Sequence, residues 1–234
     1  MNTEPKKSRY INFPICLLAN AQENFQKTCS NILSYGLFIF CQSHPQKNKS
    51  EQFNQAMDYY KVTIENPELS YAQGERLFNE IPPKNPKAGI STKTLMDFYT
   101  NPKSEFEIDS FLAFCGMRSI LQKKAYCKIT NEYLLARMAG LTSPMNDQKL
   151  PIMVTKYQKR YQIDKLREQL QINWGLKLYS YHARGYYISF KLTIEELITQ
   201  VEMRRAKSNK QRRISEKKAF VTQVLFKIGK SQYV

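Results

Sequence analysis

Lysine, arginine and glutamine residues are concentrated in one segment of the chain, TKYQKRYQIDKLREQLQINWG, residues 155–175. Apolar residues recur there at spacings of three and four, and this spacing predicts the buried face of a helix. The apolar residues are Ile163, Leu166, Leu170 and Trp174. Helical geometry then places cationic and amide side chains on or beside the opposite face. The candidate binding residues are Lys156, Gln158, Lys159, Arg160, Gln162 and Lys165.

These side chains have the hydrogen-bonding chemistry that nucleic-acid recognition requires. Lysine and arginine bind phosphates or guanine edges, glutamine can pair with adenine through two hydrogen bonds, and an α-helix fits the major groove of DNA. Glu168 lies on the same exposed side and would repel phosphate, so we expect contacts to concentrate toward the start of the helix. The alternative interpretation is an ordinary solvated helix face that binds nothing.

A β-hairpin is predicted directly after this helix, in NWGLKLYSYHARGYYISFKL, residues 173–192. Apolar and polar residues alternate in both halves, which is the pattern of two half-buried strands. Gly185 can adopt the positive φ that a tight turn requires. His182 and Arg184 belong to the turn and are further candidates for binding. The tyrosines of the hairpin could donate hydrogen bonds to phosphates, or could reflect strand propensity alone.

Two more helices are expected before this segment. The stretch FEIDSFLAFCGMRSILQKK, residues 106–124, is apolar nearly all round, which is typical of a central buried helix. In the stretch CKITNEYLLARMAG, residues 127–140, Thr130 can cap a second helix and Gly140 can end it. The order is then helix, short helix, third helix and hairpin.

This order of elements resembles the winged helix-turn-helix domain, over residues 106–192. The loop between Leu141 and Pro151 is longer than the tight turn of that family. The resemblance implies double-stranded DNA as the partner, with the third helix in the major groove. It also implies that the hairpin is a wing, whose tip lies near the DNA backbone or minor groove.

A basic helical extension is predicted after the hairpin, in residues 193–234. Thr193 and Glu196 form a capping box, and the helix that they start has an apolar face over residues 194–201. That face must pack either on the hairpin region or on a second subunit, as in a homodimer. A basic run follows, which we expect to be solvated or disordered until a polyanion binds, whereas the later stretch FVTQVLFKIG is expected to dock. The arginine candidates in this run are Arg204, Arg205, Arg212 and Arg213.

Positive charge is distributed unevenly along the 234 residues, whose net charge is +16. Residues 105–234 contain 24 of the 36 basic residues and 11 of the 20 acidic residues. A polyanionic partner therefore belongs to this part of the chain, unless the charge serves solubility alone.

The fold class that we expect is mainly α with a small β component. Residues 1–104 are predicted to form a mainly helical N-terminal domain, with helices near 20–42, 51–64 and 68–80 and a short helix ending at Tyr99. We find no chemical motif in it. Residues 105–192 are the winged-helix candidate, and residues 193–234 are the extension.

Metal and membrane binding are not expected. The five cysteines form no C-x-x-C pair and the chain has only two histidines, so a metal site is improbable and the cysteines are interpreted as reduced, mostly buried thiols. The apolar run near the N-terminus is too short for a signal peptide, and Leu37–Cys41 is far too short for a membrane span. We therefore expect a cytoplasmic protein.

No catalytic or cofactor motif is found, so an enzyme is not expected. The chain lacks both G-x-x-x-x-G-K-[ST] and G-x-S-x-G. The leading prediction is a sequence-specific DNA-binding protein that regulates transcription. A replication initiator of a plasmid or mobile element is the alternative within this class. An RNA-binding or scaffold protein that acts through its basic tail is the alternative of another class.

Overall fold

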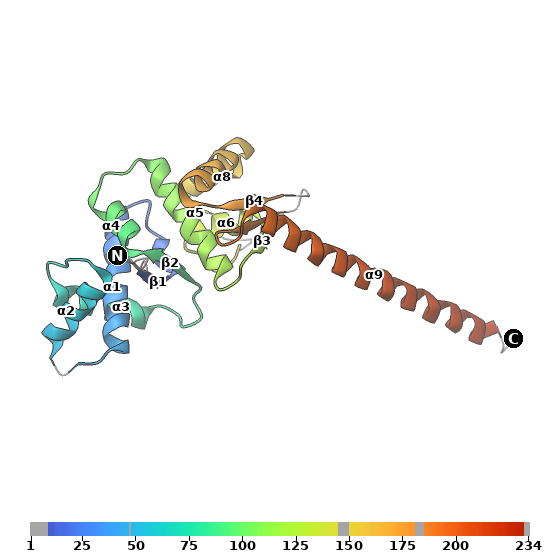
Figure 1. Ribbon diagram of the computed structural model, residues 1–234, viewed down its shortest axis with the longest axis horizontal. Coiled ribbons are helices and arrows are strands. Elements are labelled where there is room, and N and C mark those ends of the chain that lie inside the picture. The colour runs from blue at the N-terminus through green and yellow to red at the C-terminus, as the bar shows by residue number, and fades with distance from the viewer. Residues whose placement is uncertain (1–8, 47, 145–149, 181–184, 232–234) are drawn as a thin grey trace, which may run out of the picture.

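The computed structural model describes residues 9–46, 48–144, 150–180 and 185–231, and it is mainly helical with a small β component, as expected. The first elements along the chain are β1 (Tyr10–Pro14), η1 (Ile15–Leu18), α1 (Phe25–Ser43), α2 (Lys49–Tyr60), α3 (Pro67–Glu80), β2 (Lys87–Ser91) and α4 (Thr92–Thr100). They are followed by α5 (Glu105–Leu121), β3 (Cys127–Ile129), α6 (Asn131–Met138), α7 (Ile152–Thr155), η2 (Lys156–Gln158), α8 (Arg160–Trp174), β4 (Lys177–Tyr179), β5 (Tyr186–Ser189) and α9 (Ile194–Ser231). Figure 1 shows their arrangement.

The helices of the N-terminal region pack around α1, which is buried along most of its length. α3 crosses α1 closely at Gly74, where a Cβ atom would lie only 2.2 Å from the carbonyl oxygen of Ser34. Any larger residue at this position would therefore push the two helices apart. The four predicted helices of this region are confirmed, although α2 ends at Tyr60 and not near residue 64.

Two antiparallel strands, β1 and β2, join the ends of this region, and the sequence analysis did not predict them. Ile11 pairs with Ile90 and Phe13 with Ala88, and all four side chains are buried. The side chains alternate between the two faces of the ribbon, so these four point into the core together.

The central buried helix is confirmed as α5. Ser104 and Glu107 form a capping box at its start, and Phe111, Leu112 and Cys115 are completely buried in it. The acidic residues of the first turn also lie where the helix dipole favours negative charge.

The predicted hairpin is confirmed as β4 and β5. Gly185, which directly precedes β5, has the expected positive φ, +86°. A third strand that was not predicted, β3, pairs with the other edge of β5, so the strand order is β3-β5-β4. Ile188 of the middle strand lies opposite Cys127 on one side and Leu178 on the other.

One hydrophobic core extends across the domain boundary that was expected near residue 104. Buried residues from Ile11 to Ile188 form a single cluster. Phe25 of α1 packs edge-on against Phe111 of α5, with their ring centroids 5.2 Å apart. Residues 1–104 and 105–192 therefore share apolar packing.

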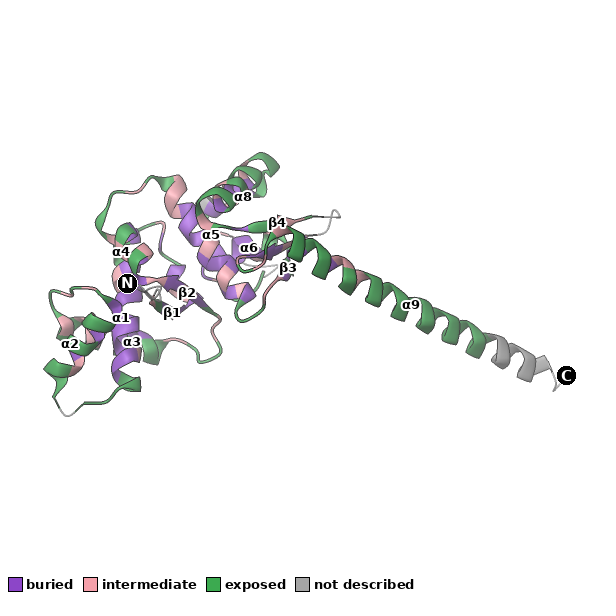
Figure 2. Cartoon of the chain, in the orientation of Figure 1, coloured by how far each residue is buried: buried purple, intermediate pink, exposed green. Residues whose placement is uncertain are grey.

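α9 is anchored at its first turns and then projects away from the rest of the protein (Figures 1 and 2). The capping box is confirmed, because Thr193 N donates to Glu196 Oε2 and Glu196 N donates to Thr193 Oγ1. Leu197 and Val201 are fully buried in the anchored part, where α9 contacts β4 and β5. Leu197 and Val201 of the predicted apolar face are thus covered within the chain, while Ile198 is 36% exposed. A homodimer through residues 194–201 is not supported.

The basic run agrees with the solvated form of the two that were expected, since α9 continues through it to Ser231 and its residues from Ala206 onward are exposed as far as Gln223. The docking that was expected for the later stretch is not seen in its described side chains. Phe220 and Val221 of the stretch expected to dock are 66% and 54% exposed. Residues from Ala206 to Gln223 are all exposed, so this part of α9 packs against no other element that the structure describes.

The prediction of mostly buried thiols is confirmed. Cys29, Cys41, Cys115 and Cys127 are buried and Cys16 is partly buried, and all five are free. Burial raises the pKa of the Cys29 thiol to about 12 and that of Cys41 to about 11. Within the described ranges there is no cluster of side chains suited to a metal ion and no helix long and apolar enough to cross a membrane.

Candidate nucleic-acid interface

α8 has the buried and exposed faces that its sequence predicts. Ile163, Leu166 and Leu170 are buried, and Gly175 ends the helix in the left-handed conformation with φ +68°. The helix begins only at Arg160, because Lys159 is extended. The residues that precede it form the separate 3-10 turn η2, so the predicted helix was too long at its start.

Most of the candidate residues are exposed near the start of α8. Gln158, Lys159, Arg160 and Lys165 are exposed, and Gln162 is half-buried. Tyr161, between them, is also exposed. These five candidates are thus at least partly accessible at or near the start of α8, and we call them together the α8 surface. Lys165 also contacts α5, because its Nζ lies 5.2 Å from the ring centroid of Phe106.

The arginines of α8 differ in how strongly they are held. Arg160 Nε lies 3.7 Å from Asp164 Oδ2, but its side chain is 97% exposed, and such a pair contributes little. Arg167 donates to Asp164 Oδ1 at 2.8 Å and to Asn131 Oδ1 of α6, and its guanidinium lies 4.0 Å from the ring centroid of Tyr186. Arg167 thus fastens α8 to α6 and β5, whereas Arg160 remains available to a ligand.

Lys156 is not part of the α8 surface, and its prediction as a DNA contact is not supported. Its Nζ lies 2.7 Å from Asp109 Oδ2 and 2.5 Å from Glu105 Oε1. Burial alone would lower the pKa of Lys156, but the hydrogen bonds and negative charges of these two carboxylates raise it. A lysine that is already paired twice has little capacity left for a phosphate.

Asp109 is the centre of this buried polar cluster. Its carboxylate is inaccessible and also accepts hydrogen bonds from Tyr157 Oη at 2.7 Å and from Gln22 Nε2 at 3.4 Å. Burial, together with the hydrogen bond to Asp109, strongly raises the pKa of the Tyr157 hydroxyl. Three segments of the chain therefore meet at one carboxylate, and η2 is fixed directly before α8.

Sequence reasoning missed the role of Asp109. The helix dipole accounts for Glu105 and Glu107 in the first turn of α5. Asp109 instead lies within the apolar part of α5 and is fully buried. A single carboxylate inside an otherwise apolar helix was the available signal, since a buried charge requires partners.

The hairpin contributes fewer candidate DNA contacts than α8 among the described residues. His182 and Arg184, the candidates in its turn, lie outside the described residues. Tyr179 Oη donates to Glu202 Oε1 of α9 at 2.9 Å, so this tyrosine joins the hairpin to α9.

The candidate arginines of α9 form a second basic surface. Arg205 pairs with Glu202 at 2.7 Å and Arg212 with Glu216 at 3.5 Å, while Arg204 and Arg213 are exposed. Figure 1 shows that α9 begins beside β4 and then projects away from α8 and the rest of the protein. The structure thus separates the predicted binding residues into two surfaces.

Comparisons with protein-family models, curated proteins and solved structures gave no match to this chain.

Proposed function

We propose that this protein is a sequence-specific DNA-binding protein of the winged-helix class that regulates transcription. The observation that carries the proposal is the α8 surface, where five cationic or amide residues are accessible beside the buried face of the helix. Lysine and arginine supply charge for phosphates, and the glutamines supply donors and acceptors for base edges.

The arrangement around α8 supports this class. The order α5, α6, α8, β4 and β5 agrees with the order of elements in the winged helix-turn-helix family. Arg167 fastens α8 to α6 and β5, and the Asp109 cluster fixes η2 directly before α8. A helix that is held rigidly can place its side chains against base edges more precisely than a mobile one. The hairpin β4–β5 takes the position of the wing in this proposal.

A second candidate function follows from α9. Its exposed part is strongly basic, and a solvated helix without packing partners is only marginally stable by itself. A polyanion, RNA included, would neutralise the basic side chains and stabilise the helix. In this alternative, α9 binds nucleic acid without reading its sequence and α8 is structural.

Selection of bound duplexes from a random pool, followed by affinity measurements with the full chain, separates the two functions. We expect a selected site to bind at least about a thousandfold more tightly than random duplex or RNA. Lys159→Ala, Arg160→Ala and Lys165→Ala should each weaken binding to that site, by about 1–3 kcal/mol where the side chain contacts a base. Arg76→Ala, an exposed arginine of α3, is the matched control.

Equal affinity for selected duplex, random duplex and RNA would contradict the α8 proposal and favour the α9 alternative. The arrangement of selected sites in the source DNA also distinguishes a regulator from a replication initiator. An initiator is expected to have an array of repeated sites, and a regulator a site beside a promoter.

A further inference from the structure

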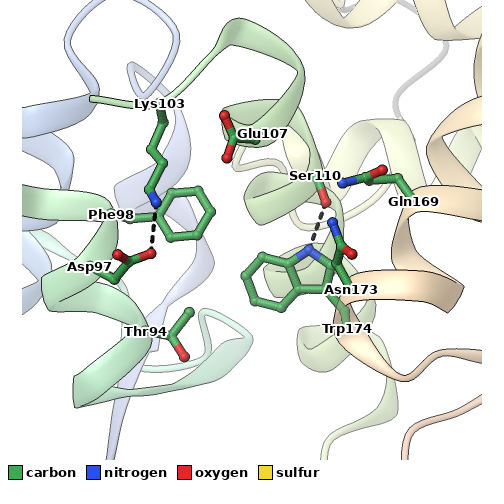
Figure 3. A pocket seen from close by; sticks show the side chains of 9 residues that line it. All are labelled: Thr94, Asp97, Phe98, Lys103, Glu107, Ser110, Gln169, Asn173 and Trp174. Atoms are coloured by element: carbon green, nitrogen blue, oxygen red, sulfur yellow. Dashed lines mark hydrogen bonds and ion pairs between the residues drawn. The ribbon is translucent and has the colours of Figure 1, made fainter. Parts of the chain in front are cut away.

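A cavity of about 230 Å³ lies between α4, α5 and the C-terminal half of α8 (Figure 3). α4 and the residues after it contribute Asp97, Phe98 and Lys103, and α8 contributes Gln169, Asn173 and Trp174. The cavity is at the end of α8 opposite to Arg160, so it is separate from the α8 surface.

The aromatic wall of this cavity is fixed without a ligand. The indole N–H of Trp174 donates to Ser110 Oγ at 2.7 Å. Phe114 stacks on the indole at a centroid distance of 4.3 Å, and Phe98 lies 5.9 Å from it. A flat apolar group could therefore bind against a surface that is already in place, which reduces the ordering cost of binding.

Negative charge predominates in the lining. The hydrogen bond from Lys103 holds the pKa of Asp97 below its usual value, and the hydrogen bonds from Ser104 do the same for Glu107. Both carboxylates are thus ionised at neutral pH. Lys103 neutralises one of them, because its Nζ lies 2.7 Å from Asp97 Oδ2.

Glu107 keeps an unused acceptor. Its Oε2 accepts from the backbone N–H and the hydroxyl of Ser104, whereas Oε1 has no hydrogen-bond donor among the described residues. The side chains of Gln169 and Asn173 also make no hydrogen bond within the described part of the chain, and Figure 3 shows them on the opposite side of the cavity from Asp97 and Lys103. The lining therefore offers one negative charge in excess of the Asp97–Lys103 pair, two amides without a hydrogen bond among the described residues, and two aromatic rings.

We propose that this cavity binds a small organic cation with a single positive charge and a flat apolar group. An ammonium or amidinium group would bond to Glu107, and the apolar part would lie against Trp174 and the edge of the Phe98 ring. Cation–π attraction to Phe98 is already used by Lys103, whose Nζ lies 5.0 Å from the centroid of that ring. An anionic lining repels phosphate, which distinguishes this site from the basic surfaces of the chain.

Trp174 is the only tryptophan, so the indole N–H gives one NMR signal that reports on this cavity directly. The full chain, without DNA, is titrated with benzamidine and 2-phenylethylamine as cationic probes. Benzamide and 2-phenylethanol are the neutral counterparts, and benzoate and phenylacetate the anionic ones. We expect at least one cation to shift the signal saturably, and its neutral and anionic counterparts to bind at least tenfold more weakly.

Two substitutions test whether the negative charge of the cavity lining determines the affinity for cations. Glu107→Gln removes the charge but keeps the capping hydrogen bond, which glutamine also makes, and should weaken cation binding roughly ten- to a hundredfold. Asn173→Asp adds a charge at an exposed position and should strengthen it. Glu80→Gln on α3 changes the net charge equally, away from the cavity, and should have no effect.

The proposal is overturned if neither cation gives a saturable shift at millimolar concentration. It is also overturned if the neutral counterparts shift the signal as strongly, or if both charge substitutions leave cation affinity unchanged. None of these measurements involves nucleic acid, so their outcome is independent of the DNA-binding proposal.

Discussion

At the scale of single residues, side chains with local partners were predictable and those with distant partners were not. The buried face of α8 follows from spacing alone, since Ile163, Leu166 and Leu170 lie on one side of any helix. The pairing of Lys156 depends on Asp109, 47 positions earlier in the sequence, and no local pattern contains that information. Lys156 was consequently assigned to phosphate by its charge alone.

The Asp109 cluster should make a large contribution to stability. Asp109→Ala leaves Lys156 and Tyr157 without their buried partner, and breaking such a pair typically costs about 3–5 kcal/mol. Tyr157→Phe removes one hydrogen bond and should cost less, about 1–3 kcal/mol. Urea unfolding measures both, with Asp58→Ala, an exposed carboxylate paired to Lys61, as control. If Asp109→Ala and Asp58→Ala had the same free energy of unfolding, the Asp109 cluster would not be stabilising.

At the scale of elements, helices were predicted more completely than strands. Caps and periodicity are local, which is why Thr130 and Thr193 were recognisable as helix caps. β1, β2 and β3 have five, five and three residues, and each pairs with a strand far along the chain. Segments this short show too little alternation to be identified without their partners.

The two glycines that flank the hairpin strands should differ in their tolerance of alanine. Both have positive φ, a conformation that costs other residues about 1–2 kcal/mol. At Gly175 a Cβ atom would meet nothing within 4 Å, but at Gly185 it would lie 2.5 Å from the carbonyl oxygen of Ile129. Gly185→Ala should therefore lower the thermal midpoint clearly more than Gly175→Ala, because strand β3 must also move. Equal midpoints would contradict this close approach.

At the scale of the whole molecule, the order of segments was predicted but their packing was not. The expected boundary near residue 104 was placed where the apolar stretch of residues 106–124 begins. The shared core, with Phe25 against Phe111, forms only when distant segments fold together. The basic helical extension was predicted, whereas its last stretch was expected to dock and Phe220 and Val221 of that stretch are exposed.

Truncation after Met203 should separate stability from nucleic-acid affinity. The residues that anchor α9, Leu197 and Val201, remain, and the removed residues whose side chains the structure describes, up to Gln223, include no buried apolar side chain. The free energy of unfolding should then change by no more than about 0.5 kcal/mol. Affinity for all duplexes should fall by a similar factor, and the slope of log affinity against log salt should decrease by about 0.9 for each phosphate that α9 no longer neutralises. An unchanged slope would count against α9 as a DNA-binding element, and sedimentation of both forms checks for altered oligomerisation.

The projection of α9 also affects how the protein moves in solution. At 1.5 Å per residue, its 38 residues extend over about 57 Å, whereas a compact chain of this size has a radius of gyration of about 18 Å. Such a particle tumbles anisotropically and diffuses more slowly than a sphere of equal mass. Its elution volume in gel filtration will therefore suggest a mass above 27.5 kDa even for a single chain.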